Sequence, residues 1–390
     1  MSNLKTLISN RWLVLILWFG LSLFAVAKGV LVNDGTTHNY SNYIIYKYDY
    51  TNLIHQKSLF GPQEKNLDLN HYGPVFSLVI APFALLPDKI GVILWVLFNC
   101  WVLYKAVSLL PLTQAAAMAI LFINANSMMG SSGNVQVNPL IVALVIFSFV
   151  FIRNKQDFWA ALMIMIGTAI KLYGVVGLAF FFFSDNKIKL LLSLLFWGAV
   201  LFVLPMLFSS PAYIIQTYHD WYPDLLAKNA TNLVSTRGNV SVMGMISKIF
   251  HYQHLSNIIV LIPALLLFGL SLLRKKYWQN ARYQMLTLAS VLIFTVIYST
   301  GSEPPTYIIA FIGVAIWLVN QSKPIGAWNW VLFVFALLLS SFSNSDVIPR
   351  YLRVNYIIPY ALIVLPCLLI WLKIIYEMLT RKFEVEEYAI

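Results

Sequence analysis

The sequence predicts an all-α membrane protein that crosses the bilayer many times. Its 390 residues are 60% hydrophobic and only 11% charged, which is more apolar surface than a soluble core buries. The apolar residues recur in runs near the length of about 20 residues that a helix needs to span a bilayer. A spanning backbone must satisfy its own hydrogen bonds, so these runs are expected to be helices. We expect one integral membrane domain over residues 1–390, with about 10–13 membrane segments that include short or broken helices.

The predicted membrane segments are the apolar runs, several of which are too short for a straight crossing. They fall at 12–32, 74–86, 90–109, 112–128, 139–152, 158–183, 190–209, 255–273, 283–299, 305–320, 327–341 and 354–376. The first run follows Lys5 and Arg11 and is longer than the apolar core of a signal peptide. We therefore expect a retained first helix whose start is cytoplasmic.

The run at 158–183 is unusual because it is too long for one crossing and too short for two full ones. Lys171 lies near its middle, between Gly167 and Gly174. An ammonium at that depth is costly unless it faces a watery or anionic cavity. Flanking glycines allow a helix to break at such a place. If the basic loops on both sides are cytoplasmic, the run must enter the membrane and return, turning near Lys171.

The formal net charge of +11 is spread through short loops rather than gathered on one face. This distribution follows the positive-inside rule and argues against nucleic acid as a partner. The loops at 153–155, 186–189 and 274–282 and the tail at 377–390 are therefore expected in the cytoplasm. The long polar loops at 33–73 and 210–254 are then expected on the exterior side.

All six histidines lie in these two exterior loops, together with carboxylates and aromatic residues. The titratable side chains suit proton transfer, with solvated loops as the alternative interpretation. The aromatic residues suit sugar stacking, although an interfacial belt is the better explanation for most of them. Two cysteines within apolar runs indicate neither a disulfide framework nor a metal site. The sequence has no P-loop, dinucleotide fingerprint, HExxH or GxSxG motif, so we expect no nucleotide or nicotinamide cofactor.

Five short motifs follow one another in order between residues 42 and 177. They are NYIIYK at 42–47, HYGPVF at 71–76, APFALLPDKIGVILWVLFN at 81–99, GNVQVNP at 133–139 and TAIKLYG at 168–174. In this order they resemble glycosyltransferase family 87, whose members are polytopic membrane enzymes of the GT-C fold. The resemblance implies a GT-C glycosyltransferase that moves a hexose, with mannose one candidate, from a polyprenyl-phosphate donor to a lipid or glycan acceptor.

The resemblance also implies an extracytoplasmic active site and inversion at the anomeric carbon in one displacement. The lipid-linked donor arrives activated, so no cofactor is expected. We expect the protein in a bacterial inner (plasma) membrane. Two other functions are open: a transporter or channel, which would need an inverted repeat that the sequence does not show convincingly, and a relative that binds a lipid-linked sugar without transferring it. Another enzyme of lipid-linked sugars, such as a polymer ligase, would share the cavity and differ in its acceptor.

Families of the GT-C fold resemble one another in using an acidic residue of the first exterior loop as the base. The resemblance places Asn42 at that position, and an amide cannot accept the acceptor's proton at neutral pH. Either activity is lost or another carboxylate serves. We expect Asp68, four residues before Tyr72, to be the catalytic base, with Asp34 second. A solvated loop acid is the alternative interpretation of both.

Further candidates bind the donor or the sugar. Lys171 is expected to stabilise the leaving phosphate, with Arg237 and Arg350 as weaker candidates. Substrate contacts are expected from Asn42, Tyr46, Lys47, His71, Tyr72, Gln136, Asn138, His219 and Glu303. The structural alternatives are a snorkelling lysine, loop and helix-cap contacts, a carboxylate at a helix N-terminus, and solvated histidines.

Overall fold

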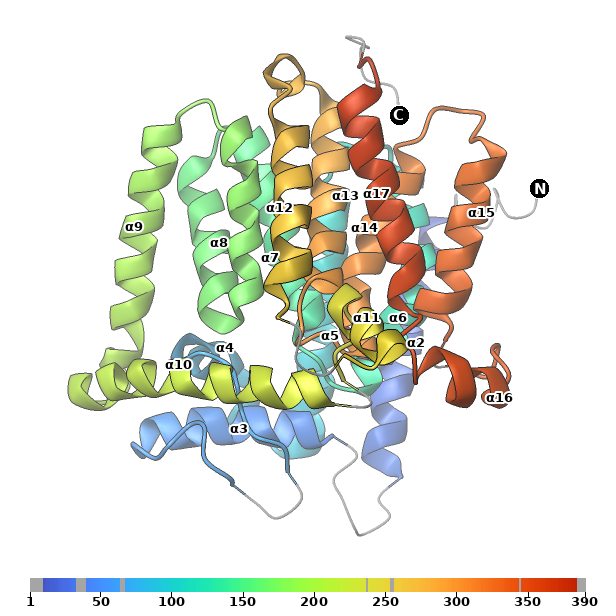
Figure 1. The fold of residues 1–390 in the computed structure, drawn as a ribbon. Helices are drawn as coiled ribbons and strands as arrows, with labels where there is room; N and C mark the ends of the chain where they lie inside the picture. Colours follow the sequence, from blue (N-terminus) through green and yellow to red (C-terminus); the bar gives the residue numbers. More distant parts are fainter. Residues whose placement is uncertain are drawn as a thin grey trace. The chain divides into compact units, whose positions relative to one another are not determined.

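Helices are the regular secondary structure of the part of the protein that the computed structural model describes. That part comprises residues 10–32, 40–63, 67–235, 238–252, 256–343 and 345–383. Within these ranges there is no β-strand (Figure 1). Three segments in them are long and apolar enough to cross a membrane, namely Arg11–Leu31, Asp88–Ser108 and Lys187–Leu207, and further apolar helices are shorter. These features confirm a polytopic, all-α membrane fold that includes short helices.

The protein divides into two compact units. Unit 1 comprises Met1–Val14, Leu110–Ser127 and Asn229–Ile390, and unit 2 comprises Leu15–Leu109 and Met128–Lys228. The helices that belong wholly or mainly to unit 2 are α2 (Arg11–Leu31), α3 (Ser41–Ile54), α4 (Pro74–Ala84), α5 (Asp88–Ser108), α7 (Asn138–Arg153), α8 (Asp157–Ile170), η1 (Leu172–Phe183), α9 (Lys187–Val203), η2 (Leu204–Leu207) and α10 (Pro211–Val234).

The helices of unit 1 are α6 (Gln114–Gly133, mainly in this unit), α11 (Val242–Phe250), α12 (Ile258–Leu272), η3 (Lys275–Tyr277), α13 (Ala281–Ile297), η4 (Pro304–Thr306), α14 (Tyr307–Val319), α15 (Ala327–Ala336), η5 (Leu337–Ser341), α16 (Arg350–Leu352), η6 (Arg353–Ile357) and α17 (Val364–Thr380). Helices α13, α14 and α17 pack together as the core of this unit. Helix α14 is buried on every side, which is why its sequence is apolar without a polar face.

The run at 158–183 forms two short helices that return on themselves, as its length and charge predicted. Helix α8 ends at Ile170, Lys171 has extended backbone (φ −148°, ψ 123°), and η1 runs back beside α8. The hydroxyl of Ser184 donates to Asp157 Oδ1 at 2.8 Å. This hydrogen bond joins the two helices at the ends that lie away from Lys171. Lys171 therefore lies at the turn of a helical hairpin.

The two glycines that flank Lys171 bring the legs of this hairpin together. A Cβ atom on Gly174 would overlap the carbonyl carbon of Gly167 and the amide nitrogen of Thr168. A Cβ on Gly167 would lie 3.0 Å from Gly174 Cα. The glycines thus allow the backbones of α8 and η1 to touch just above the turn.

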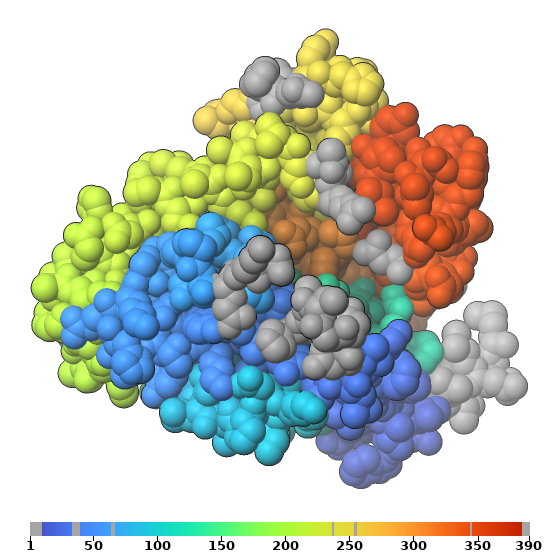
Figure 2. Space-filling model, turned by 90° about the horizontal axis from the view of Figure 1, so that it is seen from below, coloured from blue at the N-terminus to red at the C-terminus, as the bar shows by residue number. Residues whose placement is uncertain are grey.

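The polar segments expected as exterior loops are largely helical. Segment 33–73 contains α3, and segment 210–254 contains α10 and α11. Within unit 2, α3 and α10 run across the direction of α8 and α9 (Figure 1) and lie side by side in the view from below (Figure 2). Leu53, Leu59 and Ile214 form a buried cluster between them. Helices that run across the spanning direction in this way are typical of the membrane interface.

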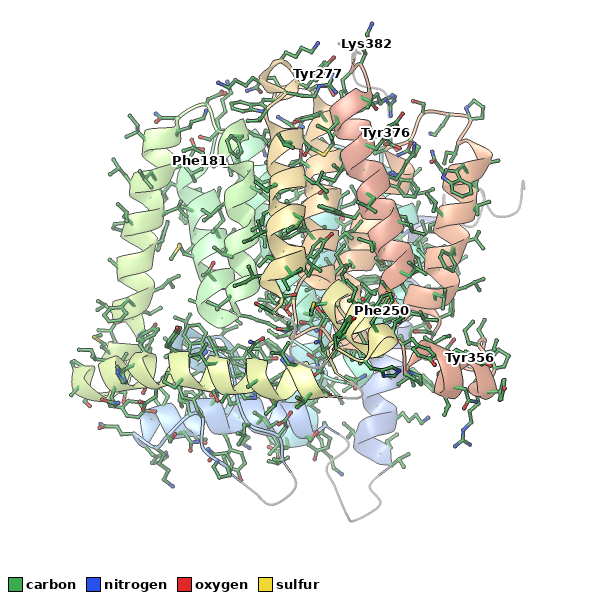
Figure 3. The ribbon with its side chains drawn as sticks, viewed as in Figure 1. Phe181, Phe250, Tyr277, Tyr356, Tyr376 and Lys382 are labelled. Carbon is green, nitrogen blue, oxygen red and sulfur yellow. The ribbon has the colours of Figure 1, made fainter. Side chains whose placement is uncertain are left out.

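Basic loops share one end within each unit. In unit 2, Lys155 Nζ lies 2.9 Å from Asp185 Oδ2, at the end of α8 that is opposite Lys171. In unit 1, the guanidinium of Arg274 donates to the backbone oxygens of Met378 and Arg381 at 2.7 and 2.8 Å. Figure 3 shows Tyr277 and Lys382 at this end of unit 1, with Phe250 and Tyr356 toward the other. The positive-inside rule predicts that loops of this kind face the cytoplasm.

Candidate functional site

Residues 67–73 form a strap that is fixed between α10 and the end of α8 next to Lys171. The Gly73 amide donates to Ile170 O at 3.1 Å, and the indole N–H of Trp221 donates to His71 O at 3.0 Å. A Cβ on Gly73 would overlap the α8 backbone and lie 2.7 Å from the Trp221 ring, so only glycine fits here. The HYGP motif is therefore held next to the turn that carries Lys171.

His71 and Asp224 form a mostly buried pair within unit 2. Their Nδ1 and Oδ2 atoms are 2.8 Å apart, and the side chains are 20% and 10% exposed. Two further histidines of unit 2 have different surroundings. His55 is exposed at the end of α3. The His219 side chain on α10 is 78% exposed, and its Nδ1 lies 3.5 Å from Asp220 Oδ1. Only His71 among these three combines burial with a buried carboxylate partner.

Asp68 lies on the same strap but faces water. Its side chain is 72% exposed, and Oδ2 is 3.6 Å from the Nζ of Lys228. Its Oδ1 accepts a hydrogen bond from the Leu69 amide at 2.9 Å. The carboxylate expected as the base is thus close to His71 in the sequence and well solvated.

Three predicted residues form one hydrogen-bonded series at the hairpin turn. The Lys171 ammonium donates to Asn138 Oδ1 at 3.2 Å, and Asn138 Nδ2 donates to Gln136 Oε1 at 3.2 Å. Asn138 is fully buried at the start of α7, and Lys171 Nζ also lies 4.5 Å from the ring centre of Tyr173. A partly buried ammonium is therefore held in a defined place by an amide and an aromatic ring.

The candidates on α3 connect this helix to the rest of unit 2. The hydroxyls of Tyr46 and Tyr72 are 3.4 Å apart, and their rings meet edge to face at 5.4 Å. The Asn42 side-chain amide donates to Asn134 O at 2.8 Å, in the loop that carries Gln136. Lys47 forms an ion pair with Asp88 at the start of α5. Asn42 and Lys47 thus both have structural partners.

Asp49 is a buried residue that the sequence analysis did not select. Its Oδ1 accepts a hydrogen bond from the Asn70 amide, and Asn70 Oδ1 accepts from the Tyr72 backbone N–H at 3.0 Å. Burial raises the pKa of the Asp49 carboxyl well above its usual range. Helical periodicity could have identified this residue, because Asp49 is three residues after Tyr46 and shares its buried face of α3.

The remaining candidates belong to unit 1 or lie outside the described residues. Asp34 and Arg237 fall outside those residues. In unit 1, Glu303 forms a capping box with Thr306 at the start of η4, which matches the helix-terminus alternative. Arg350 is exposed at the start of α16.

Comparison with known proteins identifies the family of this protein. The family model for glycosyltransferase family 87 matches residues 70–300, more than half of the sequence, including most of the strap, Lys171 and Asp224. A search of curated proteins found no match. The family match confirms what the order of the motifs predicted: the protein belongs to glycosyltransferase family 87 and is a membrane glycosyltransferase.

Proposed function

We propose that the protein transfers a hexose from a polyprenyl-phosphate donor to a lipid or glycan acceptor, with inversion, on the extracytoplasmic side of a bacterial inner membrane. Mannose is one candidate hexose. The observation that carries the proposal is the position of Lys171, which the hairpin turn and Asn138 hold beside the strap of residues 67–73. Family membership supplies glycosyl transfer, and this arrangement supplies a cation and proton-accepting groups in one region.

The ammonium of Lys171 suits the departing phosphate. When the bond between the anomeric carbon and the phosphate oxygen breaks, negative charge develops on that oxygen. A cation that is already oriented stabilises this charge without reorganising. The Asn138 amide oxygen orients the ammonium at 3.2 Å and itself carries no net charge. A lipid-linked donor needs such a group close to the membrane interface.

The interfacial position of the region supports a lipid-linked donor. Helices α3 and α10 run across α8 at the end where Lys171 turns, whereas Lys155 marks the opposite end. Helix α8 has 14 residues and is therefore about 21 Å long. With Lys155 in the cytoplasm, the Lys171 end would face the exterior leaflet.

Sugar contacts are proposed from groups around the turn and the strap. Tyr72 offers a ring and a hydroxyl beside Tyr46, and Gln136 offers an amide next to Asn138. Asn42, Lys47, His219, Glu303, Arg237 and Arg350 stay predictions as further donor or sugar contacts. For proton removal the strap holds two candidates, Asp68, which stays a prediction, and His71.

Transfer is tested by incubating the purified protein in lipid nanodiscs with radiolabelled polyprenyl-phosphate hexoses and a membrane-lipid extract. Labelled nucleotide sugars serve as comparison donors. We expect product only from the lipid-phosphate donors. Transfer from a nucleotide sugar alone would overturn the donor class, and tight donor binding without any product would identify a non-catalytic relative.

The role of Lys171 is tested in the same assay. The Lys171→Met variant keeps most of the side chain's volume and removes its charge, so we expect the KM for the donor to rise at least about tenfold. Lys155→Met is the matched control, because Lys155 is exposed at the opposite end of α8. Equal donor KM values for the two variants would contradict the assignment.

A further inference from the structure

We infer that His71, oriented by Asp224, accepts the proton of the acceptor hydroxyl. This inference rests on the proposed transfer reaction and assigns its base. His71 Nδ1 and Asp224 Oδ2 are 2.8 Å apart, and both side chains are mostly buried. The pair joins the strap to α10 across 153 positions of sequence, within unit 2.

The carboxylate partner fixes which imidazole nitrogen acts. An ionised carboxylate only accepts hydrogen bonds, so the Nδ1 of His71 must carry the hydrogen that Asp224 accepts. In the neutral ring, Nε2 then holds the basic lone pair. After Nε2 takes up a proton, the negative charge of Asp224 stabilises the imidazolium. The pair therefore has the two properties that a general base needs, a defined tautomer and a stabilised product.

Asp68 is less suited to the role. Its side chain is 72% exposed, and its Oδ2 lies 3.6 Å from the Nζ of Lys228. As classes of side chain, carboxyl groups have a pKa near 4 and imidazoles one of about 6.5. A base is most effective when its pKa lies near the operating pH, which favours an imidazole. A histidine base also accounts for the amide at position 42, where the family pattern has an acid.

The strap holds His71 close to Lys171. Gly73 is hydrogen-bonded to Ile170, and His71 lies two residues before Gly73. From the reach of an extended backbone, the Cα atoms of His71 and Lys171 are at most about 16 Å apart. Both residues therefore belong to one region of unit 2. The Trp221 hydrogen bond to His71 O holds the backbone of the base in place.

The transfer step needs His71 as the proton acceptor and Lys171 beside the leaving phosphate, and no further reactant. The acceptor oxygen attacks the anomeric carbon while its proton moves to Nε2 of His71. The bond from the anomeric carbon to the phosphate oxygen breaks, and its electron pair leaves with the polyprenyl phosphate beside Lys171. One C–O bond forms and one breaks, and the imidazolium then releases its proton to water.

The base is tested with steady-state kinetics between pH 5 and 9. For the wild type we expect kcat/KM to fall toward the acidic end of this range, where a protonated imidazole cannot accept the proton. His71→Asn should lower kcat by about 10²–10⁴ with little change in the donor KM, and should remove this acidic limb. His55→Asn is the matched control, because His55 is exposed at the end of α3. Added imidazole should partly restore turnover to His71→Gly, more so at higher pH.

Asp224 is tested as a positioning residue. Asp224→Asn should lower kcat at least about tenfold and shift the acidic limb to lower pH, since the neutral amide no longer stabilises the imidazolium. Asp220→Asn is the control one turn earlier on α10, where the carboxylate is half exposed and bonded to Gln216. A purely structural role for Asp224 would change the folded yield without moving the pH limb.

Two results would overturn the inference, and they are distinguishable. A His71→Asn or His71→Gln variant that keeps wild-type turnover and the acidic limb, with turnover lost in Asp68→Asn, would assign the base to Asp68 and leave the proposed transfer intact. A wild-type protein that binds the donor and transfers no sugar would overturn the proposed function and this inference together. Donor binding by each variant shows that it has folded.

Discussion

Replacing Gly174 by alanine tests the packing that positions Lys171. A methyl group at this position would meet the carbonyl carbon of Gly167 and the amide nitrogen of Thr168 rather than side-chain atoms. Backbone atoms within a helix cannot move aside without breaking its hydrogen bonds. The two legs of the hairpin must therefore separate, and the Lys171 ammonium must move from its place 3.2 Å from Asn138 Oδ1.

The size of the effect follows from two opposing terms. Forcing a methyl group into a packed interior costs about 1–3 kcal/mol, and a clash with rigid backbone belongs at the upper end. Replacing a helical glycine returns up to about 1 kcal/mol through the lower entropy of the unfolded state. We expect a net loss of about 2 kcal/mol for Gly174→Ala. Gly177→Ala should lose less, because its Cβ would meet side-chain atoms of Ile164, at 2.8 Å, and Ser148 rather than backbone atoms.

Gly20 provides the control, since a Cβ there would have no neighbour within 4 Å. Gly20→Ala should be neutral or slightly stabilising. The assay is the midpoint of thermal unfolding in one detergent at one scan rate, which ranks variants even where unfolding is irreversible. The expected order of midpoints, from highest to lowest, is Gly20→Ala, then Gly177→Ala, then Gly174→Ala, and donor affinity should fall only in the last. A Gly174→Ala protein as stable as Gly20→Ala would show that α8 and η1 do not pack as described.

Three further predictions concern other parts of unit 2. Burial raises the pKa of Asp49, so the folded protein retains a proton that the unfolded state loses above about pH 4. Folding stability should therefore fall as the pH rises from there. Asp49→Asn should flatten this dependence when thermal midpoints are compared at pH 5 and pH 8. Lys47 and Asp88 are each about one-third exposed, so a double-mutant cycle should yield a coupling of at most about 1 kcal/mol. A membrane-impermeant maleimide should label a cysteine at position 55 from outside intact cells and one at position 155 only after permeabilisation; labelling of both from one side would contradict the proposed orientation.

The helical hairpin could be predicted from the sequence because its signals are local and physical. A charge between two glycines in a run of intermediate length permits few arrangements, and a turn at Lys171 is the one that the structure adopts. The segments at 33–73 and 210–254 were harder to interpret. Their polar residues indicate exposure, which an open loop and a helix packed on the surface share. Burial of Leu53, Leu59 and Ile214 between α3 and α10 decides between the two, and it is a tertiary contact.

The same distinction separates the candidate residues. The order of the motifs led to the strap and to the network of Gln136, Asn138 and Lys171, since each motif is contiguous in sequence. The partner of His71 could not be found in this way, because Asp224 lies 153 positions away and carries no motif of its own. Sequence patterns thus identified the groups that could react, whereas burial and pairing distinguish a solvated acid from an oriented base.

The partners of the two groups assigned to the reaction differ in charge, and the difference suits their tasks. His71 must become positive as it removes a proton, so a carboxylate partner, Asp224, is favourable because it stabilises the charge that appears. Lys171 is positive from the beginning, and a carboxylate in the place of Asn138 would compete with the phosphate for it. The oxygen of Asn138 orients the ammonium and adds no negative charge beside it. Each partner therefore stabilises the state of its side chain that the reaction requires: imidazolium after proton removal, and an oriented cation before the phosphate leaves.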